Sequence, residues 1–122
     1  MKLPTLLAAT LLAMPLAVRA AHAQAVNLHV RTAGDLAEIC GADPRSPVGV
    51  AKLNYCSGFA QGAVDVEFLH VGASKPFCIP PNVKREVTLH EFVNWVRAIP
   101  AHASENAVTG LFRFLAERYP CK

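Results

Sequence analysis

Four cysteines limit the ways in which this chain of 122 residues can fold: Cys40, Cys56, Cys78 and Cys121. An even number of cysteines in a short exported chain implies a disulfide framework, and four cysteines allow three pairings. Zinc modules instead carry closely spaced cysteine pairs, and no C-x-x-C pair occurs here. We therefore expect two structural disulfides, on condition that the chain is exported.

The first 23 residues have the pattern of a secretory signal peptide. They begin with one lysine, continue with an apolar stretch over residues 3–18 and end in the small residues Ala21-His22-Ala23. A membrane anchor is the alternative, but a span needs roughly 20 apolar residues and Arg19 interrupts this run. We expect cleavage near Ala23, which leaves one exported domain over residues 24–122 and no membrane attachment.

The charge of the mature chain argues against nucleic-acid binding. Cleavage removes Lys2 and Arg19, so ten basic and nine acidic residues remain and the formal charge is near +1. No basic stripe is left to contact phosphates. Nucleic-acid binding is therefore not expected of the mature chain.

Helical periodicity dominates the mature sequence, and no segment alternates convincingly as a strand does. Thr32 is expected to cap a short first helix that ends near Cys40. Residues 41–49 contain two prolines and two glycines, which predicts a loop, and a longer helix is expected over residues 51–70. With two further helices, the fold class is all-α, a small disulfide-bonded bundle of about four helices.

The starts and ends of the last two helices are also predicted. Thr88 and Glu91 match a capping box, in which the side chain of each residue bonds to the backbone N–H of the other. The third helix should therefore start at Thr88, and Pro100 should end it. Ser104 is the expected cap of the last helix, which ends before Pro120.

The positions of the cysteines favour one of the three pairings. In a helical hairpin, the start of the first helix lies beside the end of the second. Cys78 precedes the third helix and Cys121 follows the fourth, while Cys40 ends the first helix and Cys56 lies near the start of the second. We therefore favour Cys40–Cys56 and Cys78–Cys121.

Three residues inside the predicted helices have two interpretations each. Gly58 and Gly62 lie four residues apart in the second helix, where each costs about 1 kcal/mol relative to alanine. We expect them at a crowded crossing in the core, with a dimer contact as the alternative. Trp95 is expected to be partly buried core, and an exposed anchor for a partner is the alternative.

The sequence carries no recognisable catalytic or metal-binding motif. No H-E-x-x-H, G-x-S-x-G or phosphate-binding glycine loop occurs, so we expect neither an enzyme nor a cofactor. The histidines are scattered along the chain at His22, His29, His70, His90 and His102. His102 is expected to be a solvated residue of the last interhelical loop, and a histidine that acts as a pH switch is the alternative.

Five motifs, taken in order, are similar to those of the Rap/Tai family. They are LAEIC, YCSGFAQGAVD, FCIP, HEFVNWVRAIPAHASENA and LAERYPC. The first begins at residue 36 and the last ends at residue 121. The most specific are the run from Tyr55 to Phe59, the Phe77-Cys78-x-Pro80 stretch and the terminal Tyr119-Pro120-Cys121. This chain departs from the family at Ile99-Pro100, where members often have His-Pro.

The resemblance implies a function. Rap/Tai proteins are periplasmic immunity proteins that protect bacteria from peptidoglycan amidase effectors of type VI secretion. They are all-helical, disulfide-bonded and often dimeric, and they inhibit by occluding the amidase cleft. The alternatives for this chain are a periplasmic acid-stress chaperone and a non-enzymatic interaction module of the cell envelope.

The resemblance also leads to a candidate partner-binding segment, the loop of residues 98–106. Clamping the helices on both sides would hold this loop in one conformation and lower the ordering cost of binding. We expect it to enter the effector cleft through four residues: His102, Ser104, Glu105 and Asn106. The alternative is that Ser104 only caps a helix and the others are solvated.

Overall fold

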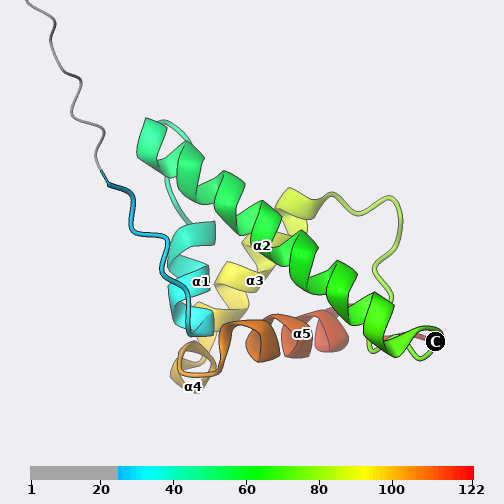
Figure 1. Cartoon of the computed structure of the whole chain (residues 1–122). Coiled ribbons are helices and arrows are strands. Elements are labelled where there is room, and N and C mark those ends of the chain that lie inside the picture. Colours follow the sequence, from blue (N-terminus) through cyan, green and yellow to red (C-terminus); the bar gives the residue numbers. More distant parts are fainter. Residues whose placement is uncertain (1–24) are drawn as a thin grey trace, which may run out of the picture.

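The structure is a computed structural model that describes residues 25–122, and the predicted signal peptide lies outside the described residues. The described part forms five helices and no strand, which confirms the all-α disulfide-bonded bundle (Figure 1). The helices are α1 (Ala33–Cys40), α2 (Pro47–Val71), α3 (Arg85–Ala98), α4 (Pro100–Ala103) and α5 (Ala107–Arg118).

Helix α1 starts and ends where the sequence predicts. Thr32 is its N-cap, and a complete capping box forms with Asp35. The Asp35 N–H donates to Thr32 Oγ1 at 3.1 Å, and the Thr32 N–H donates to Asp35 Oδ2 at 2.9 Å. These bonds satisfy two of the N–H groups that a helix start leaves unpaired.

Helix α2 begins earlier than predicted, at Pro47 rather than near residue 51, so the prediction of a loop through residue 49 was wrong in its last part. Ser46 caps the helix by accepting from the Gly49 N–H at 2.9 Å. Pro47 occupies the first helical position, where proline loses no intrahelical bond. Gly49 has no room for a side chain, because a Cβ there would lie 1.8 Å from the Asp43 carbonyl oxygen.

Helix α3 starts at Arg85, so the predicted capping box at Thr88 and Glu91 was wrong. Thr88 lies inside the first turn, where its buried hydroxyl is 3.1 Å from the Tyr119 hydroxyl. Glu91 accepts from Arg118 at 2.9 and 3.1 Å. Both side chains bind the end of α5 instead of capping their own helix.

The end of α3 agrees with the prediction, because the helix stops at Ala98, shortly before Pro100. The loop that follows contains a helix that was not predicted, the four-residue α4. Pro100 stands at the start of α4, so the same proline that cannot continue α3 fits the first turn of the next helix.

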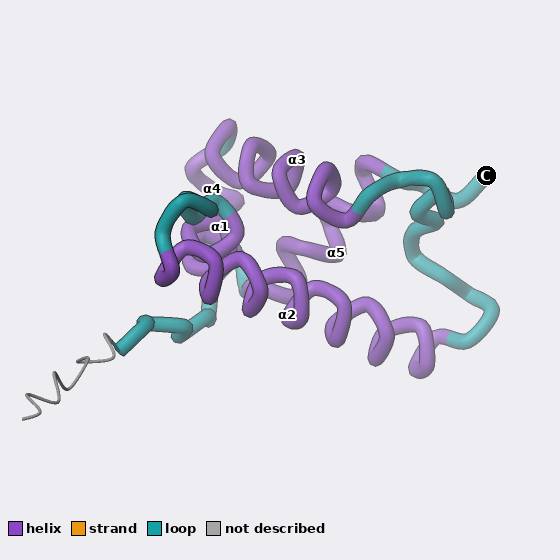
Figure 2. The backbone as a smooth tube through the Cα atoms, turned by 90° about the horizontal axis from the view of Figure 1, so that it is seen from above, coloured by secondary structure: helices purple, strands orange, loops and turns teal. Residues whose placement is uncertain are grey.

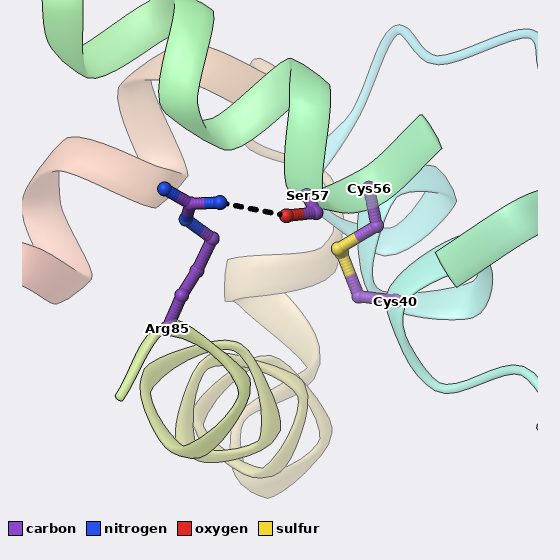
Figure 3. Close-up of a disulfide and its surroundings, with 4 residues drawn as sticks. All are labelled: Cys40, Cys56, Ser57 and Arg85. Atoms are coloured by element: carbon purple, nitrogen blue, oxygen red, sulfur yellow. Dashed lines mark hydrogen bonds between the residues drawn. A yellow bond between two sulfur atoms is a disulfide. The ribbon is translucent and has the colours of Figure 1, made fainter. Parts of the chain in front are cut away.

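Both favoured disulfides are present. Cys40 joins Cys56, and Cys78 joins Cys121, with Cα–Cα distances of 5.2 and 4.9 Å. The first bond links α1 to α2 in the interior (Figure 3), since both of its cysteines are buried. The second links the segment before α3 to the segment after α5, and both of its cysteines are exposed.

Helix α1 lies at the centre of the packing and contacts each of the other four helices. The fully buried large side chains come from four helices and from the segment before α3: Phe77, Phe92, Leu36, Leu111 and Cys56. Seen from above, α2 and α3 run along opposite sides of the molecule, with α5 between them (Figure 2). The core sits around α1, and near the end of α2 the Phe68 ring packs on Phe77 while Val66 and Leu69 are exposed.

The expected crowded crossing at Gly58 and Gly62 is not found. A Cβ built at either glycine would meet no atom within 4 Å, and both residues are exposed. Val66 and Leu69 continue the same face of α2 and are 67% and 86% exposed. The two glycines thus belong to an open helix face.

Candidate functional site

The loop of residues 98–106 is fixed against the start of α1 at one end of the bundle (Figure 1). The Ala33 N–H donates to the Glu105 carbonyl at 2.8 Å, and the Ala107 N–H donates to the Arg31 carbonyl at 3.0 Å. Gly34 fits closely beneath the loop, because a Cβ there would lie 3.0 Å from the Ala103 carbonyl oxygen. Backbone bonds to a segment far away in sequence therefore hold both ends of the turn.

His102 is buried in the loop, with 5% of its surface exposed, so the expectation of a solvated histidine was wrong. Its ring stacks on the Trp95 ring, with centroids 3.6 Å apart. Its Nδ1 lies 3.0 Å from the Trp95 carbonyl oxygen, which makes Nδ1 the protonated ring nitrogen, since a carbonyl can only accept. The buried His102 side chain therefore attaches the loop to Trp95 of α3.

Trp95 is half-buried and packs against the core, as expected. Its ring lies within 6.4 Å of Phe92 and 5.9 Å of Phe114, between centroids. Its Nε1–H donates to Glu117 Oε2 at 2.8 Å. The indole therefore ties α3 to both α4 and α5.

Asn106, and not Ser104, caps α5, so the prediction for this cap was wrong. Asn106 Oδ1 accepts from the N–H groups of Val108 and Thr109, at 3.0 and 3.3 Å. The Ser104 hydroxyl donates instead to the Ala101 carbonyl at 2.9 Å, within α4. Both polar side chains are exposed while they make these local bonds.

Substitution at the two positions should separate these roles. We expect Asn106→Ala to lower the free energy of unfolding by about 1 kcal/mol, because two N–H groups of α5 lose their acceptor. Ser104→Ala removes a bond at an exposed site and should change stability by less than about 0.5 kcal/mol. Urea denaturation of both variants measures the difference, and equal losses would contradict the assignment of the cap.

Glu105 belongs to a charged network on the flank of the loop. Its carboxylate accepts from Arg113 Nη1 at 2.7 Å, and Arg113 Nε donates to Glu117 at 3.1 Å. Arg113 also lies over the Trp95 ring, 5.9 Å from its centroid. The sequence spacing is compatible with the Arg113–Glu117 pair, four positions apart in α5, but it gives no sign of the bond from Trp95, which is 22 positions before Glu117.

The four predicted site residues thus lie together in one rigid turn, but they differ in exposure. Ser104 and Asn106 are exposed, Glu105 is half-buried and His102 is buried. Ile99, 49% exposed, adds an apolar side chain to the outer surface of the turn. The arrangement offers a preformed, mostly uncharged protrusion, and contact of these residues with a partner stays a prediction.

Comparison with known protein families assigns this chain to one of them. The family model described as Rap1a immunity proteins matches residues 32–121, which is more than half of the chain. The chain belongs to the Rap1a immunity protein family. No curated protein and no solved structure gives a significant match. The matched span includes both disulfides and the whole of the loop over residues 98–106.

Membership confirms the resemblance seen in the sequence motifs and implies a type VI secretion immunity protein, whose partner is a secreted effector. Rap1a proteins as a class act by binding and not by catalysis. Over residues 25–122, no helix has the length and apolar character that a membrane span requires. In the same part of the chain, no three potential metal ligands gather at one place.

Hydrogen bonds hold the pKa of four carboxyl groups of this Rap1a protein below their ordinary values, and for Asp43 the main cause is the Arg45 side chain. The Thr32 backbone N–H is the main cause of the lowered pKa of Asp35. The Arg118 guanidinium lowers the pKa of Glu91, and the Trp95 Nε1–H lowers the pKa of Glu117. Each bond favours the ionised form of the carboxyl in the folded state.

We therefore expect the stability of the folded domain to fall in acid. The unfolded state binds these protons more readily, so the stabilisation is complete above about pH 4.3 and is lost as the pH falls through the lower folded pKa values. Thermal unfolding between pH 7 and pH 2 measures the decline. Glu91→Gln should flatten it, while Glu86→Gln, at an exposed residue of the same helix, should leave it unchanged; identical profiles for both variants would contradict the role of Arg118.

Proposed function

We propose that this chain is a periplasmic immunity protein that inactivates a peptidoglycan amidase effector of type VI secretion by occluding its active-site cleft. In this proposal, removal of residues 1–23 after export leaves residues 24–122 as the inhibitory domain. The single observation that carries the proposal is the match of residues 32–121 to the Rap1a immunity family. The order of the sequence motifs, which is similar to that of Rap/Tai proteins, supports the amidase as the effector.

The loop of residues 98–106 is the segment that we propose to enter the cleft. A protrusion that is already fixed loses little conformational freedom on binding, which leaves more of the contact energy as affinity. The bonds to Ala33 and Arg31, together with the Trp95–His102 stack, supply this rigidity. Ser104 and Asn106 would touch the effector, Glu105 would line the flank, and His102 would support the turn from inside.

An inhibition assay with a type VI peptidoglycan amidase effector from the organism that encodes this chain tests the proposal. We expect Ser104→Arg to weaken inhibition at least about tenfold, or 1.4 kcal/mol, because the larger charged side chain prevents entry of the loop. Ser74→Arg makes the same change at another exposed serine, which lies in the loop after the C-terminal end of α2, away from the loop of residues 98–106. This variant should inhibit as the wild type does. Undiminished inhibition by folded Ser104→Arg would refute the assignment of the loop.

We also propose that the open face of α2 joins two copies of the chain. Uncharged residues follow this face with helical spacing: Val50, Asn54, Gly58, Gly62, Val66 and Leu69. Asp65 is a charged residue on the same exposed face, and the two glycines permit close approach of two helices in a symmetric pair. Light scattering should give a dimer for the wild type and a monomer for Gly62→Arg; a monomeric wild type would rule out this contact.

A further inference from the structure

A hollow of about 250 Å³, the Arg85 groove, opens between α2 and α3. Its floor is formed by Leu111 and Leu115 of α5, the helix that lies between α2 and α3 in Figure 2. Ala60 and Val64 line the wall on α2, and Leu89 lines the wall on α3. The groove is thus apolar on three sides.

Among residues 25–122, Arg85 is the only charged residue that lines this groove. Its side chain reaches from the start of α3 toward α2, as Figure 3 shows. There Nη1 donates to Ser57 Oγ at 3.2 Å, and Nη2 donates to Gln61 Oε1. Both acceptors are neutral, and no ion pair within residues 25–122 includes Arg85.

A carboxylate would be a better acceptor for this guanidinium than the two neutral groups. The planar fork of arginine matches the two oxygens of a carboxylate, and charge-assisted bonds of this kind are about twice as strong as neutral ones. The Arg85 side chain is exposed, so it can turn from Ser57 and Gln61 toward a ligand without disturbing the core. An incoming carboxylate would form two charge-assisted hydrogen bonds with the Arg85 guanidinium in place of two neutral ones.

A second hollow, of about 410 Å³, lies on the other side of Arg85 and shares Leu89 with the first. It borders the Cys40–Cys56 disulfide and is also lined by Glu86. The Glu86 carboxylate would repel an anion there, whereas the first hollow holds no acidic group. The charges therefore place an anionic ligand at the mouth of the Arg85 groove.

We propose that the Arg85 groove binds a segment of a partner protein in which a carboxylate stands next to a large apolar side chain. The apolar side chain fills the space above Leu111 and Leu115, and the carboxylate pairs with Arg85. The hollow is larger than the ~150 Å³ cavity that admits benzene in another protein, so one aromatic or branched aliphatic side chain fits. The inference rests on the proposed function, in that the partner is the effector.

A peptide titration tests the groove without the effector. Acetyl-Gly-Glu-Leu-Gly-amide is added to the isotope-labelled mature protein and followed by NMR, with the matching Gln peptide as a control. We expect saturable shifts at Gln61, Arg85 and Leu89, and binding at least about tenfold weaker for the Gln peptide. Equal binding of the two peptides, or no saturable shift at these residues, would overturn the proposal.

Two variants of neighbouring residues extend the test. Arg85→Gln should abolish peptide binding, while Lys84→Gln removes the same charge one position earlier, at an exposed side chain outside the groove, and should bind as the wild type does. In the amidase assay, Arg85→Gln should inhibit at least about tenfold more weakly than Lys84→Gln. Full inhibition by Arg85→Gln would overturn the groove and leave the proposed function intact, whereas a wild type that fails to inhibit would overturn the proposed function.

Discussion

Phe92→Ala should lower the free energy of unfolding by about 3–5 kcal/mol, the range seen when a buried phenylalanine is truncated. Phe92 has no exposed surface, and its ring meets Phe114 edge-on, with centroids 5.7 Å apart. The substitution removes the packing of the Phe92 ring against Phe114 and Trp95 and leaves a cavity that the rigid helices cannot close. A domain of this size is stable by only about 5–15 kcal/mol, so the loss is a large fraction of the total free energy of unfolding.

Urea denaturation followed by circular dichroism measures this loss. Val87→Ala is the matched control, since Val87 lies on the same helix and is 50% exposed. Its free energy of unfolding should change by about 0.5 kcal/mol or less. If Phe92→Ala and Val87→Ala cost the same, the core described around α1 and α3 is not the one that stabilises the protein.

Removing the Cys78–Cys121 disulfide is the second large change. The two cysteines are 43 positions apart, and the chain-entropy model gives about 4 kcal/mol for closing a loop of that length. The double variant Cys78→Ala/Cys121→Ala should therefore unfold at a temperature lower by on the order of 10 °C or more. Because both cysteines are exposed, alanine at these positions removes little buried packing, so the loss reports mainly on the cross-link.

Thermal unfolding of the oxidised wild type and the double variant provides the measurement. Reducing the wild type with a thiol should lower its unfolding temperature at least as far as the double variant, because it breaks both disulfides. The backbone N–H of residue 78 also donates to the Tyr119 carbonyl, and Phe77 beside it is buried. An unchanged unfolding temperature in the double variant would show that these two contacts already hold this end of the bundle together.

Features set by neighbouring residues could be predicted from the sequence, and features set by distant contacts could not. The predicted cap of α1 at Thr32 was correct, because its partner Asp35 lies within one turn of Thr32. The predicted end of α1 near Cys40 was also correct. The cap at Thr88 was wrong although its pattern was equally good. Its two side chains bind Tyr119 and Arg118, which are 31 and 27 positions away from Thr88 and Glu91.

The candidate site shows the same division. Pro100 indicated a turn after α3, and the turn is present, because proline acts on its own backbone. The burial of His102 depends on a stack with Trp95 across the break between two helices, which no local pattern reveals. The Arg85 groove arises where α2 and α3 diverge over α5, and it was not foreseen from the sequence.

We propose that this stiff, oxidised helical domain acts by obstruction of its effector. Titration of a type VI peptidoglycan amidase effector from the same organism with the purified protein, followed through the hydrolysis of peptidoglycan, tests this mechanism. The account predicts that activity falls in proportion to the protein added and disappears near one inhibitory site per amidase. Full amidase activity in the presence of excess folded, disulfide-bonded protein would contradict it.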